Sequence, residues 1–423
     1  MSDDCISSVS EHATVLMGQS PPSASCSETG DGLPFIQGNA EFGARYPIPR
    51  LRCSAPARIA EVGDLLLSVR APVGELNQAR ERTVIGRGLA ALRFPANDRD
   101  YAWHAVKWAT YQLGRVAQGS TFVAVSRKDV ERLAIPWHGE LNLFIAGLLD
   151  AVDGAIAKTE AIIVKLREMR TGLLHDLLTR GLDKNGQLRD PVAHPEHFQD
   201  SLMGLIPKEW SVCGILDFAP ADRPPVLTGP FGAQLGQSDF VTEGVPVLRI
   251  GNVQAGFLDL SDLQHVTQEK ASELARYRVS SGDLLFARQG ASTGRNALAE
   301  SRVDGWLINY HIIRVAVDQN RCEPVVLHAL FNSEAVQRQI NRDKGRGTRE
   351  GINTSEIIGL RFPIPPFPEQ RVIVAALNAQ SQQLDAELLL LSKLTALKRG
   401  VVGDLLTGRV RVPESILATE ARA

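Results

Sequence analysis

The stretch LNLFIAGLLDAVDGAIAKTEAIIVKLREMRTGLLHDLLTRG at residues 141–181 contains no proline and is long enough to form a single helix. Its apolar positions recur at alternating steps of four and three residues, which is the spacing of a heptad seam. The seam consists of Leu141, Ile145, Leu148, Val152, Ala155, Thr159, Ile162, Leu166, Met169 and Leu173. This pattern predicts a helix that buries one stripe of side chains against a second helix.

A second stretch, from about Glu369 to Leu406, has the same period. Seven of its ten seam positions are apolar, and the seam consists of Ile373, Leu377, Gln380, Leu384, Glu387, Leu391, Leu394, Lys398, Val401 and Leu405. A helix of about 38 residues is roughly 57 Å long, which is too long for one small domain to bury. We expect the two helices to pack on each other, antiparallel, as a spacer between two globular modules. The alternative is that each helix packs only on its own module. Gly147, Gly154 and Ala161 lie on one stripe and would allow the helices to approach closely.

The chain repeats itself over about half its length. DLLTRG at 176–181 returns as DLLTGR at 404–409, an offset of 228 residues (404 minus 176). GDLL at 63–66 returns at 282–285, and LPFIQGN at 33–39 returns as VPVLRIGN at 245–252. These matches occur in the same order, which predicts a duplication. Each half then has short strands broken by Gly and Pro, followed by a long helix.

Composition excludes several classes of protein. Lys and Arg total 46 and Asp and Glu 48, so the net charge is −2, and a DNA-binding role requires basic residues gathered on one face or supplied by a partner. The five cysteines form no CxxC pair, which argues against a disulfide framework or a zinc ribbon and favours a cytoplasmic location. The start MSDDCISSVS is unlike a signal peptide, and no apolar run approaches the ~18 residues of a membrane helix.

Motifs for catalysis are few. GASTG at 290–294 fits the nucleophile elbow of serine hydrolases, with Ser292 as the nucleophile. No apolar helical stripe follows this serine, and RAPVG at 70–74 in the first half has no serine at the equivalent place, so we favour a turn and keep a hydrolase as an alternative. HPEH at 194–197 has no third ligand nearby, so we expect no metal site. Phosphate-loop, dinucleotide-binding and HExxH motifs are also absent from the sequence.

Basic residues gather in both halves. Residues 42–60 hold four arginines and no acid, and residues 338–350 hold five basic residues and three glycines nearby. Arg can bind the guanine edge in the major groove, and Gln or Asn the adenine edge, so these segments indicate DNA contacts. The alternative is a solvated charged surface. The candidate DNA-binding residues are Gln19, Gln37, Asn39, Arg45, Arg50, Arg52, Arg70, Arg87, Gln234, Arg249, Asn252, Arg288, Gln289, Arg295, Lys344, Arg346 and Arg349.

A set of longer motifs runs through nearly the whole chain. They are MGQSPPS at 17–23, GLPFIQGNAEFGARYP at 32–47, IPKEW at 206–210, TGPFGAQL at 228–235, EGVPVLRIGNVQ at 243–254, GDLLFARQGASTGR at 282–295, GINTSEIIGLRFPIPPFPEQ at 351–370 and LKRGVVGDLLTGRVRV at 397–412. In wording and order they resemble the specificity subunit of type I restriction-modification systems.

This resemblance implies an α/β (α+β) fold with two target-recognition domains, which have mixed β-rich cores and are separated by two long antiparallel helices in a pseudo-twofold arrangement. The expected boundaries are 1–138 and 205–366 for the recognition domains, 139–181 and 367–409 for the helices, 182–204 for a linker and 410–423 for a tail. The first half departs from the family at the start of its helix, with PWHGELNLF at 136–144, and it begins without an IPxxW segment.

The resemblance also implies a function. Such a chain reads a bipartite site on double-stranded DNA and carries no catalytic residues and no cofactor of its own. Two methylation subunits would bind S-adenosylmethionine, and restriction subunits would use ATP and Mg²⁺. The expected helix and partner interface consists of Leu141, Ile145, Leu148, Val152, Ile162, Leu166, Leu173, Leu377, Leu384, Leu391 and Leu394. A coiled-coil adaptor that binds protein instead of DNA is the second alternative.

Overall fold

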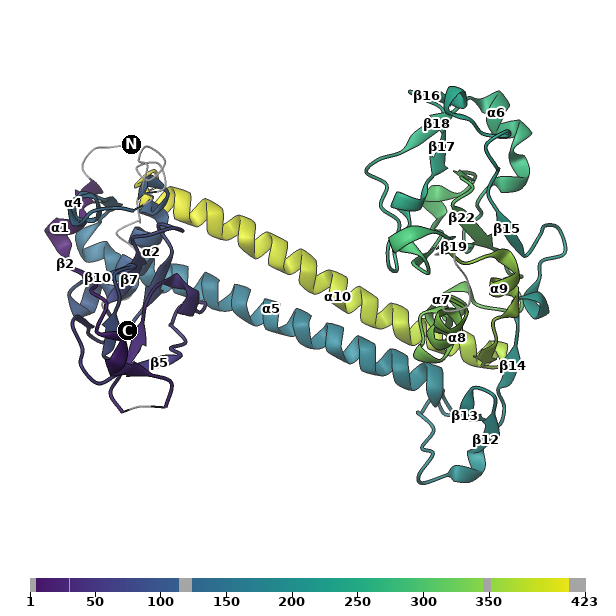
Figure 1. The fold of residues 1–423 in the computed structure, drawn as a ribbon, viewed down its shortest axis with the longest axis horizontal. Helices are drawn as coiled ribbons and strands as arrows, with labels where there is room; N and C mark the ends of the chain where they lie inside the picture. Colours follow the sequence, from purple (N-terminus) through teal and green to yellow (C-terminus); the bar gives the residue numbers. More distant parts are fainter. Residues whose placement is uncertain (1–4, 30, 114–123, 345–350, 411–423) are drawn as a thin grey trace. The chain divides into compact units, whose positions relative to one another are not determined.

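The computed structural model describes residues 5–29, 31–113, 124–344 and 351–410 (Figure 1). The chain divides into two compact units. Unit 1 consists of residues 1–162 and 387–423, and unit 2 consists of residues 163–386. Both long helices, α5 (Asn142–Thr179) and α10 (Phe367–Val401), are shared between the units.

Unit 1 is built on two β-sheets. The four-stranded sheet has the order β2 (Thr14–Met17), β10 (Leu89–Arg93), β7 (Leu65–Ser68), β8 (Leu76–Gln78). The five-stranded sheet has the order β3 (Cys26–Ser27), β5 (Leu51–Cys53), β4 (Leu33–Ile36), β9 (Thr83–Ile85), β6 (Ile59–Ala60). A further pair joins β1 (Ile6–Ser8) to β11 (Ala134–Pro136), and the short helices are α1 (Val9–His12), α2 (Arg99–Ala109) and α4 (Arg127–Glu131).

Unit 2 has the same plan. Its first sheet has the order β15 (Val226–Thr228), β22 (Ile312–Val315), β19 (Leu284–Ala287), β20 (Asn296–Leu298). Its second has the order β16 (Phe240–Val241), β18 (Gln264–Val266), β17 (Val245–Leu248), β21 (Leu307–Ile308). Two further pairs join β12 (Phe198–Ser201) to β13 (Gly204–Pro207) and β14 (Ser211–Cys213) to β23 (Phe362–Ile364). The helices are α6 (Gln268–Glu273), α7 (Pro324–Phe331), α8 (Glu334–Lys344) and α9 (Thr354–Gly359).

The duplication predicted from sequence is visible in the pairing of the strands. Each second sheet contains one parallel pair, with Ile36 opposite Ile85 in unit 1 and Leu248 opposite Ile308 in unit 2. The other sheet of each unit, β2-β10-β7-β8 in unit 1 and β15-β22-β19-β20 in unit 2, is wholly antiparallel, with equivalent strands in equivalent places. The motif matches at 33–39 and 245–252 therefore mark β4 and β17, and the two GDLL motifs mark β7 and β19.

The GDLL strands are apolar on both faces because each separates two cores. In β7, Leu65 and Leu67 lie in one hydrophobic cluster and Leu66 in another. In β19, Phe286 faces a cluster with Phe331 and Leu285 faces a different cluster. A strand buried on both faces has no polar alternation, which explains the continuous apolar runs in the sequence.

The aspartate of GDLL has a structural role in both units. Asp64 and Asp283 are almost fully buried, and each accepts a hydrogen bond from the backbone three residues earlier, at Glu61 and Ser280. Arg93 binds the carboxylate of Asp64 at 2.7 Å, and an arginine of unit 2, Arg223, binds that of Asp283 at 2.8 Å. These residues fix the turn that leads into the central strand.

The first long helix buries only part of its predicted seam. Ile145, Val152 and Leu166 are buried, whereas Leu148 is 39% and Ile162 44% exposed, so these last two residues are not buried in the seam and their place in a partner interface stays a prediction. In place of Leu148 and Ile162, the next residues along the helix, Leu149 and Ile163, are buried. Met169 is also exposed, Leu141 and Leu173 are partly buried, and no atom lies close to the Cβ positions of Gly147 and Gly154, so these glycines do not mark a close approach.

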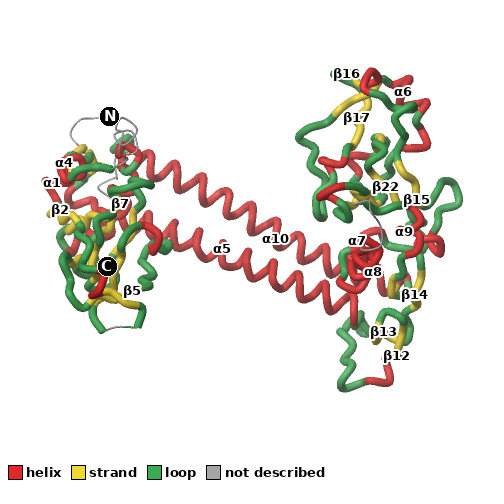
Figure 2. Tube along the Cα trace, in the orientation of Figure 1, coloured by secondary structure: helices red, strands yellow, loops and turns green. Residues whose placement is uncertain are grey.

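The second long helix follows its predicted seam throughout. Ile373 and Leu377 are buried, Leu384, Leu391 and Leu394 are partly buried, and most of the intervening residues are exposed. Within each unit the two helices lie side by side (Figure 2). Unit 1 holds the start of α5 and the end of α10, where Lys398 pairs with Asp153, and unit 2 holds the end of α5 and the start of α10. The helices are therefore antiparallel within each unit.

Each unit buries both helices in its own core. Ile145 and Leu149 of α5 pack with Leu406, which ends a π-helical turn that continues α10. In unit 2, Leu177 of α5 and Ile373 of α10 lie in one cluster. The helices are thus part of the core of each unit. They pair with each other, as the first expectation had it, and they also pack on the modules, as the alternative had it.

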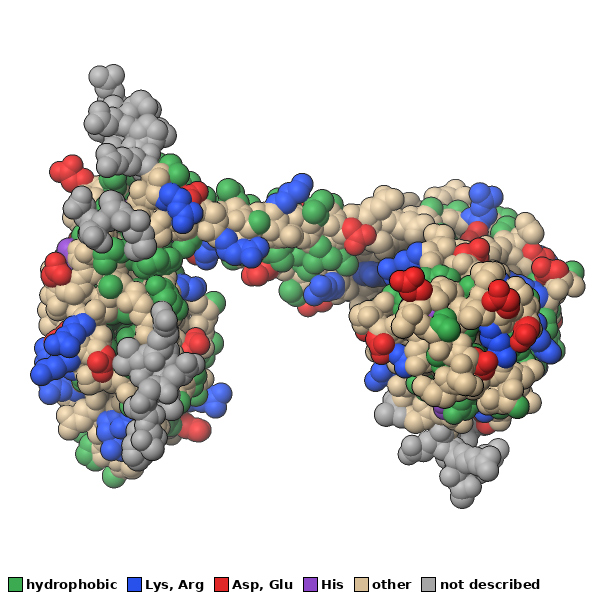
Figure 3. All heavy atoms as spheres, turned by 90° about the horizontal axis from the view of Figure 1, so that it is seen from above, with side chains coloured by type: hydrophobic (Ala, Val, Ile, Leu, Met, Phe, Trp, Pro, Cys, Tyr) green, Lys and Arg blue, Asp and Glu red, His purple; other side chains and the backbone are tan. Residues whose placement is uncertain are grey.

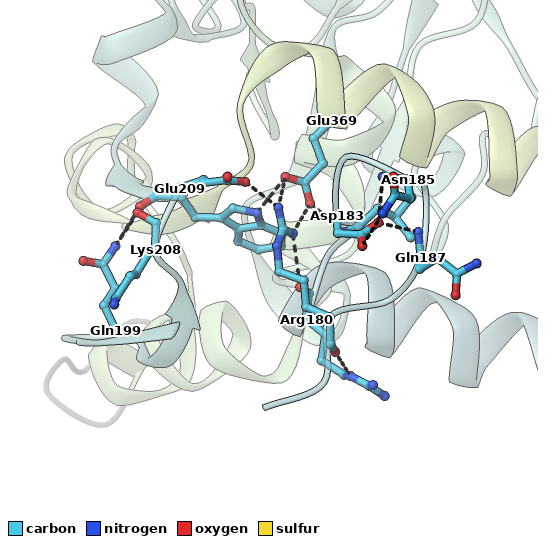
Figure 4. Close-up of polar contacts among 11 residues, drawn as sticks. Arg180, Asp183, Asn185, Gln187, Gln199, Lys208, Glu209 and Glu369 are labelled. Carbon is cyan, nitrogen blue, oxygen red and sulfur yellow. Dashed lines mark hydrogen bonds and ion pairs between the residues drawn. The ribbon is translucent and has the colours of Figure 1, made fainter. Parts of the chain in front are cut away.

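A buried polar cluster fixes the start of α10 in unit 2 (Figure 4). The Glu369 carboxylate, 10% exposed, accepts two hydrogen bonds from Arg189 at 2.7 and 3.1 Å. It also accepts from Trp210 Nε1 at 3.2 Å and from the backbone N–H of Leu182 at 2.7 Å. The IPKEW and PFPEQ motifs therefore meet around one carboxylate. A Cβ on Gly181, at φ +60, would lie 2.2 Å from this carboxylate, so no larger residue fits there.

The first long helix begins differently. Asn142 is 2% exposed, accepts from the backbone N–H of His138 at 3.0 Å and donates to Asp98 at 3.2 Å. Gln370 at the start of α10 is 1% exposed and caps backbone groups in a comparable way, at Glu323 and Pro365. A buried amide thus supports both starts, and the departure seen in the sequence changes the helix start but not the architecture.

Buried histidines predict how stability depends on pH. Burial lowers the pKa of His104 in unit 1 and of His328 in unit 2. As pH falls below about 6.5, these histidines bind protons in the unfolded chain but stay neutral in the folded chain. Stability therefore falls with pH until the pH is below their lowered pKa values in the folded chain. We expect the thermal unfolding midpoint to decrease from pH 7 to pH 5, and less steeply for His328→Gln. The same steepness in that variant would contradict the assignment.

Candidate nucleic-acid interface

One turn in each unit carries the chain from the second sheet into the antiparallel sheet, which is β2-β10-β7-β8 in unit 1 and β15-β22-β19-β20 in unit 2. We call it the crossing turn: residues 86–89 between β9 and β10 in unit 1, and residues 309–312 between β21 and β22 in unit 2. A backbone hydrogen bond closes each turn, from Leu89 to Gly86 at 3.0 Å and from Ile312 to Asn309 at 3.0 Å.

Three other strands end at the crossing turn. In unit 1 the turn accepts hydrogen bonds from Gly18, just after β2, and Val69, just after β7, and it donates one to Ile36 at the end of β4. In unit 2 Gly229, Arg288 and Leu248 make the same three bonds. A Cβ on Gly18 would lie 2.1 Å from the Gly86 oxygen, and one on Gly229 would lie 2.2 Å from the Asn309 oxygen. Only glycine allows this approach, which explains the glycines of MGQSPPS and TGPFGAQL.

The crossing turn gathers exposed polar side chains in unit 1. Gln19 follows Gly18, Gln37 follows β4, and Arg87 is in the turn itself, and all three are exposed. Arg70, also exposed, follows β7 and pairs with Ala124 through a β-bridge. Four of the predicted DNA-binding residues, distant in sequence, are thus brought to one edge of the sheet.

The equivalent edge of unit 2 holds Arg249, Arg288 and Gln289, with the exposed Arg295 just before β20. Gln289 pairs with Gly351 through a β-bridge, as Arg70 does with Ala124. The Nε groups of Arg249 and Arg288 are buried without a hydrogen-bond partner among the described residues. Burial and the nearby charge of Arg288 lower the pKa of His311, so the positive charge of this edge rests on its arginines.

Other predicted contacts are occupied within the fold. The structure contradicts the prediction for Asn252, which is 4% exposed and uses its amide on the backbone of Arg249, Asp259 and Asp262. Arg45 binds Asp100 at 2.6 Å and Asp150 at 3.4 Å, so it is a structural ion-pair residue in the isolated chain.

The remaining predictions fall into three groups. Gln234 accepts a hydrogen bond from Tyr277 at 2.9 Å, and Arg249 also pairs with Asp262 at 2.6 Å. Asn39 is partly buried, and Arg50 and Arg52 are exposed beside and on β5. Arg346 and Arg349 lie outside the described residues, as does the side chain of Lys344 at the end of α8.

The structure describes the two motifs for which the sequence argued against a catalytic or metal site, GASTG at 290–294 and HPEH at 194–197. Ser292 lies in a 3-10 turn and is followed by strand β20, so the helix that a nucleophile elbow requires is missing. His194, Glu196 and His197 bring ligand atoms within 4.8 Å of one another, and the third ligand missing from the sequence argument is Glu196 itself. All three are exposed and Glu196 is hydrogen-bonded to His194 at 3.1 Å; the absence of a metal stays a prediction.

Sequence reasoning missed the aromatic residues of the unit 2 edge. Phe231 is 59% exposed and Tyr310, in the crossing turn, is 38% exposed. The available signal was the comparison between the copies, because the positions that match these residues are Ser20 and Arg87 in unit 1.

None of the helices in the described ranges could cross a membrane.

Comparison with known proteins agrees with this geometry. A model of the type I restriction modification DNA specificity domain matches residues 207–395. A putative type I restriction enzyme MjaX specificity subunit of Methanocaldococcus jannaschii is 35% identical over 168 residues, which cover 39% of this chain and 40% of that protein. The type I restriction enzyme MjaVIII specificity subunit of the same organism is 20% identical over 316 residues, 74% of this chain and 70% of that protein.

A solved structure shows the same fold over nearly the whole length. The S subunit of a type I restriction-modification system from M. genitalium covers 95% of this chain and 96% of its own, with a TM-score of 0.57 and 14% identity. The chain therefore carries a type I restriction modification DNA specificity domain at residues 207–395, is similar in sequence to type I specificity subunits, and shares its α/β fold with long helices with an S subunit of known structure.

Proposed function

We propose that this chain is the DNA sequence-recognition subunit of a type I restriction-modification enzyme, and that it reads a bipartite site with one recognition domain for each half. The observation that carries this proposal is the crossing turn, which gathers Arg and Gln side chains at the same sheet edge in both units. Arginines there bind phosphates or guanine, and glutamines bind adenine. We place the recognition domains at residues 1–138 and 205–366.

In this proposal the chain is a scaffold without catalysis or cofactor. Two methylation subunits supply S-adenosylmethionine, and restriction subunits supply ATP and Mg²⁺ chemistry, in the cytoplasm. Apolar side chains are exposed on the helical part of the face that Figure 3 shows, and both helices contribute exposed apolar residues. They are Ile162, Val164 and Met169 of α5 and Leu388, Leu389, Leu390 and Leu397 of α10. Exposed apolar stripes of this kind suit contact with helices of a partner, so we assign them to the methylation subunits. The helix pair then sets the length of the unread gap between the half-sites.

The Arg70→Ala, Arg87→Ala double variant tests the role of the unit 1 edge. Loss of two phosphate-binding cations lowers affinity for duplex DNA and reduces the slope of log affinity against log salt by up to about two. Binding is measured by gel shift of the complex with methylation subunits. The matched control is Arg82→Ala, an exposed arginine before β9, at the end of the strand opposite the crossing turn.

The outcomes separate the two functions considered for the chain. Equal affinities and slopes for wild type, double variant and control would contradict DNA reading at this edge. A protein-binding adaptor would show salt-insensitive assembly with the methylation subunits and no salt-dependent affinity for DNA. Exchange of residues 1–138 for another such domain should change one half-site only.

A further inference from the structure

The two crossing turns have the same backbone but different chemistry. Ile85 and Ile308 hold equivalent places in the parallel pairs, so Arg87 in unit 1 matches Tyr310 in unit 2. Gly18 and Gly229 are also equivalent, since each donates to the last residue of its turn, and two residues later stand Ser20 and Phe231. The same pair of positions is therefore polar in one unit and aromatic in the other.

Each pair is in contact. In unit 1 the Ser20 hydroxyl accepts from the backbone and from Nε of Arg87, both at 3.4 Å. In unit 2 the rings of Phe231 and Tyr310 lie 6.3 Å apart, within the range of an aromatic pair. We call Phe231 and Tyr310 the aromatic pair.

The surroundings of the aromatic pair hold Tyr310 in place. The Tyr310 ring lies 3.6 Å from the His311 ring, whose Nδ1 is hydrogen-bonded to Gln289 at 2.8 Å. Arg288 donates to the Tyr310 carbonyl at 3.3 Å. These contacts reduce the freedom of the Tyr310 ring without covering it, so a partner can use it with little loss of conformational entropy.

The charge around the pair identifies its partner. Two exposed rings alone would suit an apolar protein surface. Here Arg288, whose backbone is bonded to the same turn, has a buried Nε without a hydrogen-bond partner among the described residues, whereas the charge of nearby Arg249 is paired with Asp262. Rings beside an arginine match a nucleic acid, because bases offer flat faces for stacking and phosphates offer negative charge.

We propose that the aromatic pair contacts the bases of one half-site and stacks on a base step that it unstacks, whereas Ser20 and Arg87 contact the other half-site by hydrogen bonds and charge. The two copies then read DNA by different physical means on one backbone frame. Aromatic side chains that enter a base step kink the duplex locally, which the polar pair would not do. This inference rests on the proposed DNA-reading function.

The test uses the full chain assembled with its methylation subunits and a duplex bearing the bipartite motif, identified by sequencing methylated adenines in host DNA. The domain exchange described above identifies the half-site read by unit 2. 2-Aminopurine replaces single bases of each half-site in turn, apart from the methylated adenine, which a partner extrudes in any case. We expect an increase in fluorescence at a base step in the unit 2 half-site.

Variants then assign the signal. Phe231→Ala or Tyr310→Ala should remove the increase and weaken binding about five- to 150-fold, which corresponds to loss of base stacking by an aromatic side chain. Tyr310→Phe, which keeps the ring, should behave as wild type. Arg87→Ala should weaken binding in a salt-dependent way and leave the fluorescence unchanged. Because both aromatic residues are exposed, the thermal midpoint should be unchanged in these variants.

Each result decides the matter. If wild type binds DNA and both alanine variants keep the fluorescence and the affinity, the aromatic proposal is overturned and DNA reading stands. If the alanine variants instead lose the methylation subunits and the assembled fraction binds DNA normally, the pair is a protein contact and the proposal is overturned. If wild type shows no salt-dependent DNA binding, the proposed function and this inference both fail.

Discussion

Glu369→Ala is expected to destabilise unit 2 by about 3–5 kcal/mol, because it leaves the Arg189 guanidinium buried without its main counter-ion. The Arg189 side chain is 6% exposed, and the same carboxylate also accepts from Trp210 and Leu182. For a domain of this size, such a loss lowers the thermal midpoint by roughly 6–20 °C. The measurement is calorimetric or dichroic unfolding of the full chain.

Glu209→Ala is the matched control. Glu209 binds the same Arg189, at 2.6 Å, but its side chain is 70% exposed, so we expect a loss of only about 0–1 kcal/mol. Arg189→Met added to Glu369→Ala should recover part of the stability, since it removes the unpaired charge. Equal effects of Glu369→Ala and Glu209→Ala would contradict a buried lock at the start of α10.

The helices show how far a heptad pattern predicts structure. In the first helix Leu148 and Leu149, and likewise Ile162 and Ile163, are neighbours of equal hydrophobicity. The sequence cannot choose between such neighbours, and only the later of each pair is buried. In the second helix Gln380 and Glu387 made the seam look weak, yet both lie on it, partly buried. The spacing of the buried positions can thus be predicted from one sequence, whereas which of two neighbouring apolar residues is buried depends on the surface that packs against the helix.

The site was predictable by residue type more than by position. Four strand ends meet at one turn, and this brings Gln19, Gln37, Arg70 and Arg87 to one edge. The spacing of these residues in the sequence does not predict that they lie together. Whether a cation is free for a ligand depends on acids brought close by folding. Asp100 and Asp150 occupy Arg45 in this way. Phe231 and Tyr310 were missed because isolated aromatic residues are normally assigned to a core.

A one-heptad insertion in both long helices should shift the recognised site to a longer unread gap, with both half-sites unchanged. Duplicating residues 156–162 of α5 and 384–390 of α10 preserves both seams, because a heptad rotates a helix by nearly two full turns. The insertion adds about 10.5 Å along each helix, or about three base pairs at ~3.4 Å each. Each added base pair also rotates the second half-site by about 35° around the duplex axis. A shift of one or two pairs keeps that half-site closer to its original orientation, so we expect a shift smaller than three.

Binding to the original spacing should then fall to the non-specific level, a loss of about 10³-fold or more. Methylated adenines in DNA modified by the variant enzyme report the new gap directly. The control is a seven-residue insertion after Gly186, in the linker, where φ is +76 and no atom lies close to the Cβ position. That control should leave the gap unchanged, because it lengthens a surface turn and neither of the two helices. If the helix variant methylates the wild-type motif with its original gap, the helices do not set the distance between the half-sites.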